Sequence, residues 1–319
     1  MAVAKSVKRS SVKSGERKKG ILYYLIRDKY LYLLCVPAII YIFIFKYIPM
    51  YGVTIAFKDY NIFQGTLASP WVGLDVFKEV FAEEFFWIAT RNTLILNILT
   101  IAVNFPLTIV LSLMLNEVNC SGFKRVTQSI LYLPHFVSWV VVAGIVTTNL
   151  LSVRNGVVNN LLGAIGIGPI GFLVDEGWWL FSYVLSNVWK EIGWGTIIYL
   201  AALSGVDETL YEAAYIDGAT KLKRIWYITL PAIKPTIVMM LILTLSKSMS
   251  IGLDAPLLLG NDKVINVSEV LSTYVYKIGL QKTQYSLATA IGLFQSVVNI
   301  ILLVLANKTT KLLGEEGVM

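Results

Sequence analysis

Long apolar stretches alternate with polar segments along most of the chain. A bilayer core of roughly 30 Å is crossed by about 20 apolar residues in helical form, and we predict an all-α integral membrane protein with six transmembrane helices. Pro37 and Pro49 lie in the first span and predict a kink or break there, which neighbouring helices can compensate in membranes. The predicted spans are residues about 31–56, 90–115, 126–151, 178–204, 233–256 and 285–306.

The composition agrees with this pattern and narrows the possible functions. Hydrophobic residues make up 56% of the chain and charged residues 15%, whereas soluble domains are about 45–50% apolar and about 25% charged. Cys35 and Cys120 do not suggest a disulfide framework, and His135 has no neighbouring His or Cys that would indicate a metal site. The sequence contains no phosphate-binding G-x-x-x-x-G-K-[ST] loop, so an ATPase would have to be a separate chain. We expect no cofactor and no enzymatic activity, because no acid–base set is evident.

The basic residues are unevenly distributed, and this predicts the orientation. With the N-terminus inside, the inner segments hold 17 Lys and Arg residues, the outer segments seven and the spans three. Cytoplasmic loops carry the excess of these residues in membrane proteins, so both termini are predicted to be cytoplasmic. We divide the chain into a basic tail (1–29), a transmembrane domain (30–306) and a second tail (307–319). The net charge of +7 then reflects topology, and no nucleic-acid binding is expected.

A polar segment at about 205–233 separates the fourth and fifth spans and is predicted to form two short helices. Asp207 can cap the first helix, and Gly218 can end it, because glycine adopts the left-handed conformation at little cost. A second helix is predicted over 219–229, before Pro231 marks the entry to the fifth span. Such a helix–turn–helix on the cytoplasmic side is suited to press into a groove of a soluble partner.

The residues of this segment follow a spaced motif that is far less common than Glu-Ala-Ala alone. Glu212-Ala-Ala is followed after three residues by Gly218, and after nine more by Ile228-Thr229-Leu230-Pro231. This pattern resembles the EAA loop of carbohydrate-type ABC importer permeases related to the maltose permease, above all the branch of oligosaccharide and polysaccharide permeases. The resemblance covers roughly residues 30–306, with one departure at Ile225, where many relatives have Phe. Further family-like stretches are Trp71-Val72-Gly73-Leu74, Asn92-Thr93-Leu94 and Tyr132-Leu133-Pro134-His135-Phe136.

The resemblance implies a type I ABC importer fold and a set of partners. A six-helix core would pair with a second, homologous permease in the cell membrane. Two copies of an ATPase would bind ATP and Mg²⁺, and an extracellular binding protein would deliver an oligosaccharide. In this family the EAA loop docks on the ATPase, which implies a coupling role for Glu212, Ala213, Ala214, Asp217 and Gly218.

Candidates for the substrate pathway lie in the spans before and after this loop. Ionisable residues inside a membrane are costly to bury and are functional candidates by default. Two cations facing one cavity, Lys190 and Lys247, would suit an acidic oligosaccharide such as one containing uronate, although Glu191 could neutralise one of them. The same residues could instead pair between helices or with the partner permease. By likeness to the maltose permease branch, the candidates are Asn187, Lys190, Glu191, Trp194, Thr244, Lys247 and Ser248.

Two other functions stay open at this point. A secondary transporter or channel driven by an ion gradient would not need the EAA loop, and uptake after collapse of the proton gradient would distinguish it. A permease-like regulatory subunit could signal through the ATPase without moving sugar, and the sequence does not exclude it.

Overall fold

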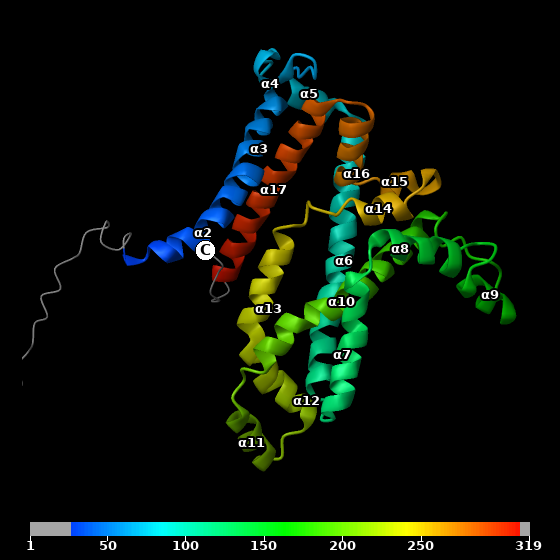
Figure 1. Cartoon of the computed structure of the whole chain (residues 1–319). Coiled ribbons are helices and arrows are strands. Elements are labelled where there is room, and N and C mark those ends of the chain that lie inside the picture. The colour runs from blue at the N-terminus through cyan, green and yellow to red at the C-terminus, as the bar shows by residue number, and fades with distance from the viewer. Residues whose placement is uncertain (1–26, 313–319) are drawn as a thin grey trace, which may run out of the picture. The chain divides into compact units, whose positions relative to one another are not determined.

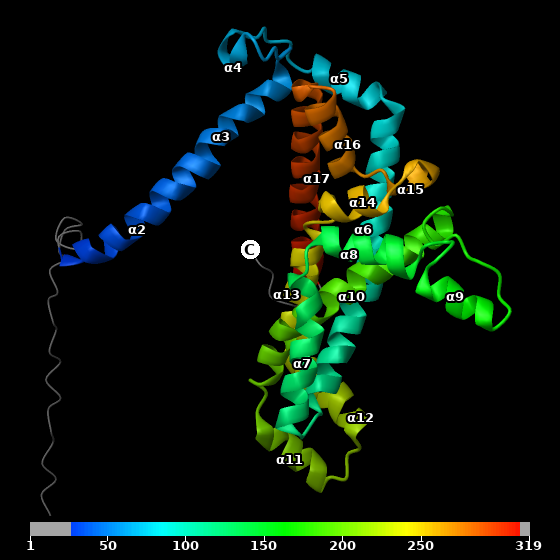
Figure 2. The same cartoon turned by 45° about the vertical axis from the view of Figure 1, so that its right-hand side comes forward.

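The computed structural model describes residues 27–312. Regular secondary structure in this range is helical, apart from one isolated β-bridge between Lys58 and Trp71 (Figures 1 and 2). This confirms the all-α class for the described residues. The described residues divide into two compact units, the first ending at Val53 and the second beginning at Thr54.

The first unit contains most of one membrane-length helix, Lys29–Phe57. It consists of α2 (Lys29–Ile42), the π-helical turn η1 (Phe43–Tyr47), α3 (Ile48–Met50) and the 3₁₀ turn η2 (Tyr51–Phe57), which continues into the second unit. Pro49 lacks an amide hydrogen, and its ring crowds the carbonyl four residues before it. The widened turn η1 lies at that place, so the disturbance predicted for the first span takes the form of a π turn.

The second unit is a bundle of long helices with short helices between them. Its first half consists of α4 (Gly65–Ala68), α5 (Asp75–Ala82), α6 (Glu84–Asn116), α7 (Ser121–Phe136), α8 (Trp139–Gly144), the π turn η3 (Ile145–Leu150), α9 (Val157–Ala164) and α10 (Glu176–Leu203). Its second half consists of α11 (Glu208–Ile216), α12 (Lys221–Arg224), the π turn η4 (Ile225–Thr229), α13 (Leu230–Leu245), α14 (Asp254–Leu259), the 3₁₀ turn η5 (Asp262–Val264), α15 (Ile265–Ser268), α16 (Leu271–Tyr276), the π turn η6 (Lys277–Gln281) and α17 (Tyr285–Leu312). Helix α10 packs against both α6 and α7.

Four helices of the described chain are long and apolar enough to cross a membrane. They are Lys29–Phe57, Glu84–Asn116, Lys221–Leu245 and Tyr285–Leu312, and the bent pair Ser121–Phe136 with Trp139–Leu150 is a fifth candidate. The predicted span 178–204 is present as α10, which is not among these candidates. The count of six spans therefore stays a prediction.

The third predicted span, 126–151, is wrong as a single continuous helix. Helix α7 ends at Phe136, and its axis makes an angle of 92° with Trp139–Leu150. Val137 is extended, and the Ser138 hydroxyl accepts the Val141 N–H at 3.4 Å to cap α8. The apolar run did not indicate the break, because hydropathy does not record a change of direction.

The fifth predicted span, 233–256, is also displaced. The helix begins at Lys221 in α12, continues through η4 and ends at Leu245 in α13. Pro231 does not interrupt it, because the widened π turn η4 lies directly before it and accommodates the missing N–H and the ring. Residues 246–253, which we call the linker, lie between α13 and α14. Lys247, which the sequence placed near the middle of a span, lies in this linker.

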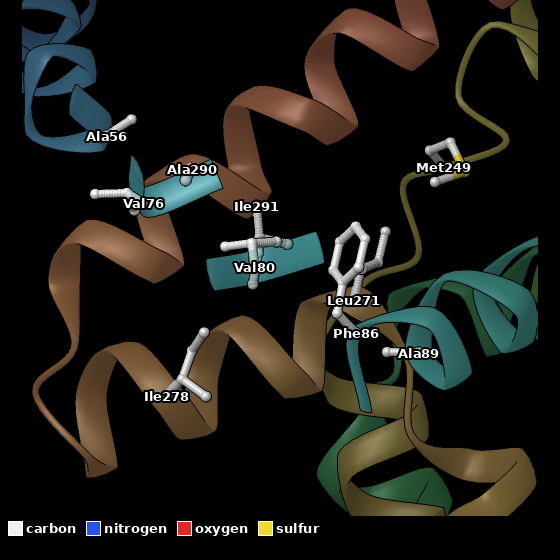
Figure 3. Close-up of a cluster of buried hydrophobic side chains, with 10 residues drawn as sticks. All are labelled: Ala56, Val76, Val80, Phe86, Ala89, Met249, Leu271, Ile278, Ala290 and Ile291. Atoms are coloured by element: carbon white, nitrogen blue, oxygen red, sulfur yellow. The ribbon is translucent and has the colours of Figure 1, made fainter. Parts of the chain in front are cut away.

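Two clusters of buried hydrophobic side chains hold the second unit together. The second is built around Trp179, whose indole N–H donates to the Leu259 carbonyl at 2.8 Å. Figure 3 shows the first cluster, in which α5, α6, the linker, α16, η6 and α17 meet. Its members are Ala56, Val76, Val80, Phe86, Ala89, Met249, Leu271, Ile278, Ala290 and Ile291.

Candidate functional site

The polar segment between α10 and α13 has the predicted helix–turn–helix form. The Asp207 carboxylate caps α11 by accepting the Thr209 N–H at 2.9 Å. This backbone hydrogen bond lowers the pKa of Asp207 below its usual range. Gly218 ends the helix with a φ of +71°, and the Ala219 N–H donates to the Ala214 carbonyl at 2.9 Å. The cap and the glycine stop are therefore confirmed.

The second helix of this segment differs from the prediction. It begins at Lys221 rather than Ala219 and runs without interruption through η4 into α13. The Tyr211 hydroxyl and the Thr229 hydroxyl lie 2.9 Å apart and join α11 to the end of η4. The loop is thus tied to the long helix at two places, by its covalent continuation and by this hydrogen bond.

The segment presents its predicted coupling residues at the surface. Glu212, Ala213, Asp217 and Gly218 are exposed, and Ala214 is half-buried. Large apolar side chains around them are also exposed: Tyr215, Ile216, Leu222, Trp226 and Tyr227. In Figures 1 and 2, α11 and α12 lie together at one end of the second unit. A group of exposed apolar side chains of this kind is typical of a surface that contacts a protein or a membrane.

Lys190 lies near the middle of α10, but its ammonium is not free. The side chain is buried, and Nζ donates to the carbonyls of Pro134, His135 and Val137 at 3.2, 2.6 and 2.8 Å. These carbonyls lie at the end of α7 and directly after it, where carbonyls lack the partners that a continuing helix would supply; that of Pro134 also accepts the Val137 N–H at 3.1 Å. An ammonium has three donors, so Lys190 serves to fix the bend between α7 and α8. The hypothesis of two cations facing one cavity is wrong for this residue.

The neighbours of Lys190 form an aromatic and acidic cluster. Glu191 Oε2 lies 2.8 Å from His135 Nδ1. The Trp194 ring stacks on the His135 ring at a centroid distance of 4.5 Å and an interplanar angle of 3°. Trp194 remains 43% exposed and Glu191 half-buried. The sequence marked His135 as an unlikely metal ligand and as part of a family-like stretch, but gave no sign of its contact with Glu191, because only the packing of α7 on α10 brings the two together.

The other predicted pathway residues lie in α10, α13 and the linker. The Asn187 amide donates to the Tyr183 carbonyl at 2.9 Å and lines a cavity of about 230 Å³ together with linker residues 250–252. Thr244 and Ser248 bond carbonyls of their own segment, those of Met240 and Leu245 at 2.7 Å each. Lys247 is exposed and forms no ion pair within the described part of the chain. The two lysines therefore differ in role: the Lys190 ammonium is buried and stabilises the fold, whereas the Lys247 ammonium is exposed.

Comparisons with known proteins all match this chain to transport permeases, and two of the relatives match over nearly its whole length. The family model described as "Binding-protein-dependent transport system inner membrane component" matches residues 104–311. The chain is 46% identical over 303 residues to the polygalacturonan/rhamnogalacturonan transport system permease protein YteP of Bacillus subtilis (strain 168), covering 95% of this chain and 94% of that protein. It is 45% identical over 301 residues to protein LplB of the same organism, covering 94% of each chain.

A solved structure is similar in fold as well as in sequence. A bacterial alginate ABC transporter in complex with an alginate pentasaccharide-bound periplasmic protein contains a chain that is 40% identical. The match covers 94% of this chain and 100% of that chain, with a TM-score of 0.85. These matches exclude the alternative of a gradient-driven transporter. The chain belongs to the binding-protein-dependent transport system inner membrane components and is a permease subunit of an ABC importer, a transport component rather than an enzyme.

Proposed function

We propose that this permease imports acidic oligosaccharides, of the class that contains uronate units. The observation that carries the proposal is the similarity to permeases for two different acidic polymers. One relative is named for polygalacturonan and rhamnogalacturonan, and a second belongs to an importer of alginate. The polymers differ in their sugars and share the carboxylate, so the shared chemistry is the acidic group.

We further propose the assembly in which the permease works. The chain forms half of the translocation pathway with a second, homologous permease, and both termini lie in the cytosol. Two copies of an ATPase hold the ATP and Mg²⁺. The domain division follows: a tail at 1–29, a six-span domain at 30–306 and a tail at 307–319. The last helix reaches Leu312, so it would extend beyond the membrane into the second tail.

Coupling is proposed to run through the segment at 205–233. Closure of the ATPase dimer would push on α11 and on the turn that follows it, at Glu212, Ala213, Ala214, Asp217 and Gly218. Because α12 continues through η4 into α13, a displacement of this segment would move the long helix as a unit. The linker at the far end of α13 would receive that movement.

The substrate would pass residues from α10, α13 and the linker. Trp194 offers an exposed aromatic face, and aromatic side chains bind sugar rings by stacking. Asn187, Thr244 and Ser248 offer amide and hydroxyl groups. Lys247 offers a cation for a carboxylate, while Glu191 is paired with His135.

The substrate class is tested in proteoliposomes that contain the whole complex with its binding protein. Galacturonate and alginate oligosaccharides are compared with neutral maltooligosaccharides of the same length, and both uptake and ATP hydrolysis are measured. We expect acidic oligosaccharides to stimulate both. Stimulation by the neutral series alone would refute the acidic substrate and leave the family assignment intact.

The coupling segment is tested by Glu212→Lys. We expect normal membrane insertion, loss of transport and weaker co-purification of the ATPase, because a cation replaces an exposed carboxylate at the proposed contact. Glu208→Lys, one turn earlier on α11 and also exposed, is the matched control. Normal uptake by the Glu212 variant, or an equal loss in both variants, would contradict the assignment.

A further inference from the structure

The linker between α13 and α14 is held by amide side chains from two helices. From α6, Asn97 Nδ2 donates to the Ser248 carbonyl at 2.6 Å. From α17, Asn299 Oδ1 accepts the Met249 N–H at 3.1 Å, and Gln295 Nε2 donates to the Met249 carbonyl. We call Asn97, Gln295 and Asn299 the amide clamp.

The clamp is reinforced by a hydroxyl and by packing. Asn299 Nδ2 also donates to Ser250 Oγ at 2.8 Å, and Gln295 Nε2 lies 3.4 Å from the same oxygen. The Met249 side chain is 1% exposed and belongs to the first hydrophobic cluster (Figure 3). Buried backbone groups at a helix end need partners, and the clamp supplies them. It also fixes the two residues that directly follow Lys247.

Lys247 is therefore an exposed cation on a fixed backbone. Its N–H donates to the Thr244 carbonyl at 3.2 Å, and its carbonyl accepts the Ser250 N–H at 2.8 Å. Its side chain is exposed and forms no ion pair in the described range. Lys190, in contrast, is buried with its ammonium bound to three carbonyls. Of these two lysines, only Lys247 has an ammonium that can meet a ligand.

We propose that the amide clamp positions Lys247 so that the permease selects acidic over neutral oligosaccharides. This inference rests on the proposed function. An ammonium is a point charge on a flexible four-carbon stem, and its attraction for a carboxylate decreases with distance and with solvation. A fixed backbone reduces the entropy lost when the side chain meets its ligand. The clamp residues act through Lys247 and are positioning residues, not ligands.

The test uses the whole complex in proteoliposomes with one and the same binding protein. The probes are trigalacturonate and its fully methyl-esterified form, which differ in charge and not in ring number. The measured quantity is the ratio of uptake kcat/KM for the two probes. Because the binding protein is unchanged, a change in this ratio between variants reports on the permease.

We expect Lys247→Gln to reduce the preference for the acidic probe about tenfold, because the variant loses a hydrogen bond to a charged group. Asn299→Leu and Gln295→Met leave Lys247 in place and should reduce the same preference about fivefold each, as for a lost neutral hydrogen bond. Adding Asn299→Leu to Lys247→Gln should cause no further change in the ratio, because both act through one side chain. Ser296→Ala is the matched control, since its hydroxyl bonds only the Gly292 carbonyl of its own helix.

The outcomes separate the two proposals. If Lys247→Gln lowers the ratio but the clamp variants slow both probes equally, the clamp is merely structural and the inference is overturned. If the wild-type complex does not distinguish the probes, the acidic substrate class fails, and the inference with it. Should Asn299→Leu not insert into membranes, the milder Ser250→Ala decides, because it removes only the hydroxyl that both α17 amides contact.

Discussion

Helix α10 approaches α7 so closely at Gly193 that a single added methyl group should disturb the candidate site. A Cβ at Gly193 would lie 1.9 Å from the carbonyl oxygen of Leu131 and 2.5 Å from its carbonyl carbon. Both are backbone atoms, so no side-chain rotation relieves the clash. Because ordinary contact begins at 3.4 Å, α7 would have to move back by about 1.5 Å along this direction.

The cost of Gly193→Ala follows from this displacement. Overpacking in a close-packed interior costs about 1–3 kcal/mol, and the higher helix propensity of alanine offsets at most about 1 kcal/mol of it. The shift would also lengthen the bonds from Lys190 to the end of α7, which now measure 2.6–3.2 Å. We therefore expect a net loss of stability of about 1–2 kcal/mol together with impaired transport.

The assay is thermal unfolding of the purified complex in detergent, combined with ATP-driven uptake in proteoliposomes. Gly292→Ala on α17 is the matched control, because a Cβ there meets nothing within 4 Å in this chain. We expect the control to keep its unfolding temperature and its uptake. A Gly193→Ala permease as stable and as active as the wild type would refute the close approach of α7 and α10.

Two further predictions concern the ends of the second unit. Gly218→Ala should weaken co-purification of the ATPase, because the φ of +71° costs a non-glycine residue about 1–2 kcal/mol. Gly218→Asn should largely preserve co-purification. Equal ATPase yields with the wild type and both variants would contradict a role of Gly218 as turn former in the coupling segment. Asn92→Leu removes hydrogen bonds to the carbonyls of Asn266 and Glu269 at 2.8 and 2.9 Å, so residues 254–277 should become more sensitive to limited proteolysis, at a cost of about 1–3 kcal/mol. An unchanged cleavage pattern would show that other contacts hold that segment.

The local chemistry of the coupling segment could be predicted from sequence, because its determinants lie within a few residues. Asp207 caps the next N–H groups, and Gly218 adopts the left-handed conformation that ends α11. The end of the next helix could not be placed in the same way. It runs on from Lys221 through Pro231, since the π turn η4 directly before this proline accommodates the missing N–H, and packing decides where the helix stops.

The roles of the polar residues were decided by contacts between distant segments. Residue type and hydropathy marked Lys190 and Lys247 as equivalent candidates. Tertiary structure buries Lys190 against the carbonyls of the bend after α7 and leaves Lys247 exposed in the linker. It also joins His135 to Glu191, which are 56 residues apart in the chain.

By itself, the sequence determined the helical class, the apolar helices and the spaced coupling motif, because periodicity, composition and capping act locally. Only the tertiary structure decided where helices bend or end inside the bundle, as after Phe136 and Leu245. At both places the freed backbone groups find partners on other helices, Lys190 in one case and the amide clamp in the other. A break of this kind is stable only because a distant side chain forms hydrogen bonds with the backbone groups that the helix leaves without partners. No local sequence pattern predicts which distant side chain does so.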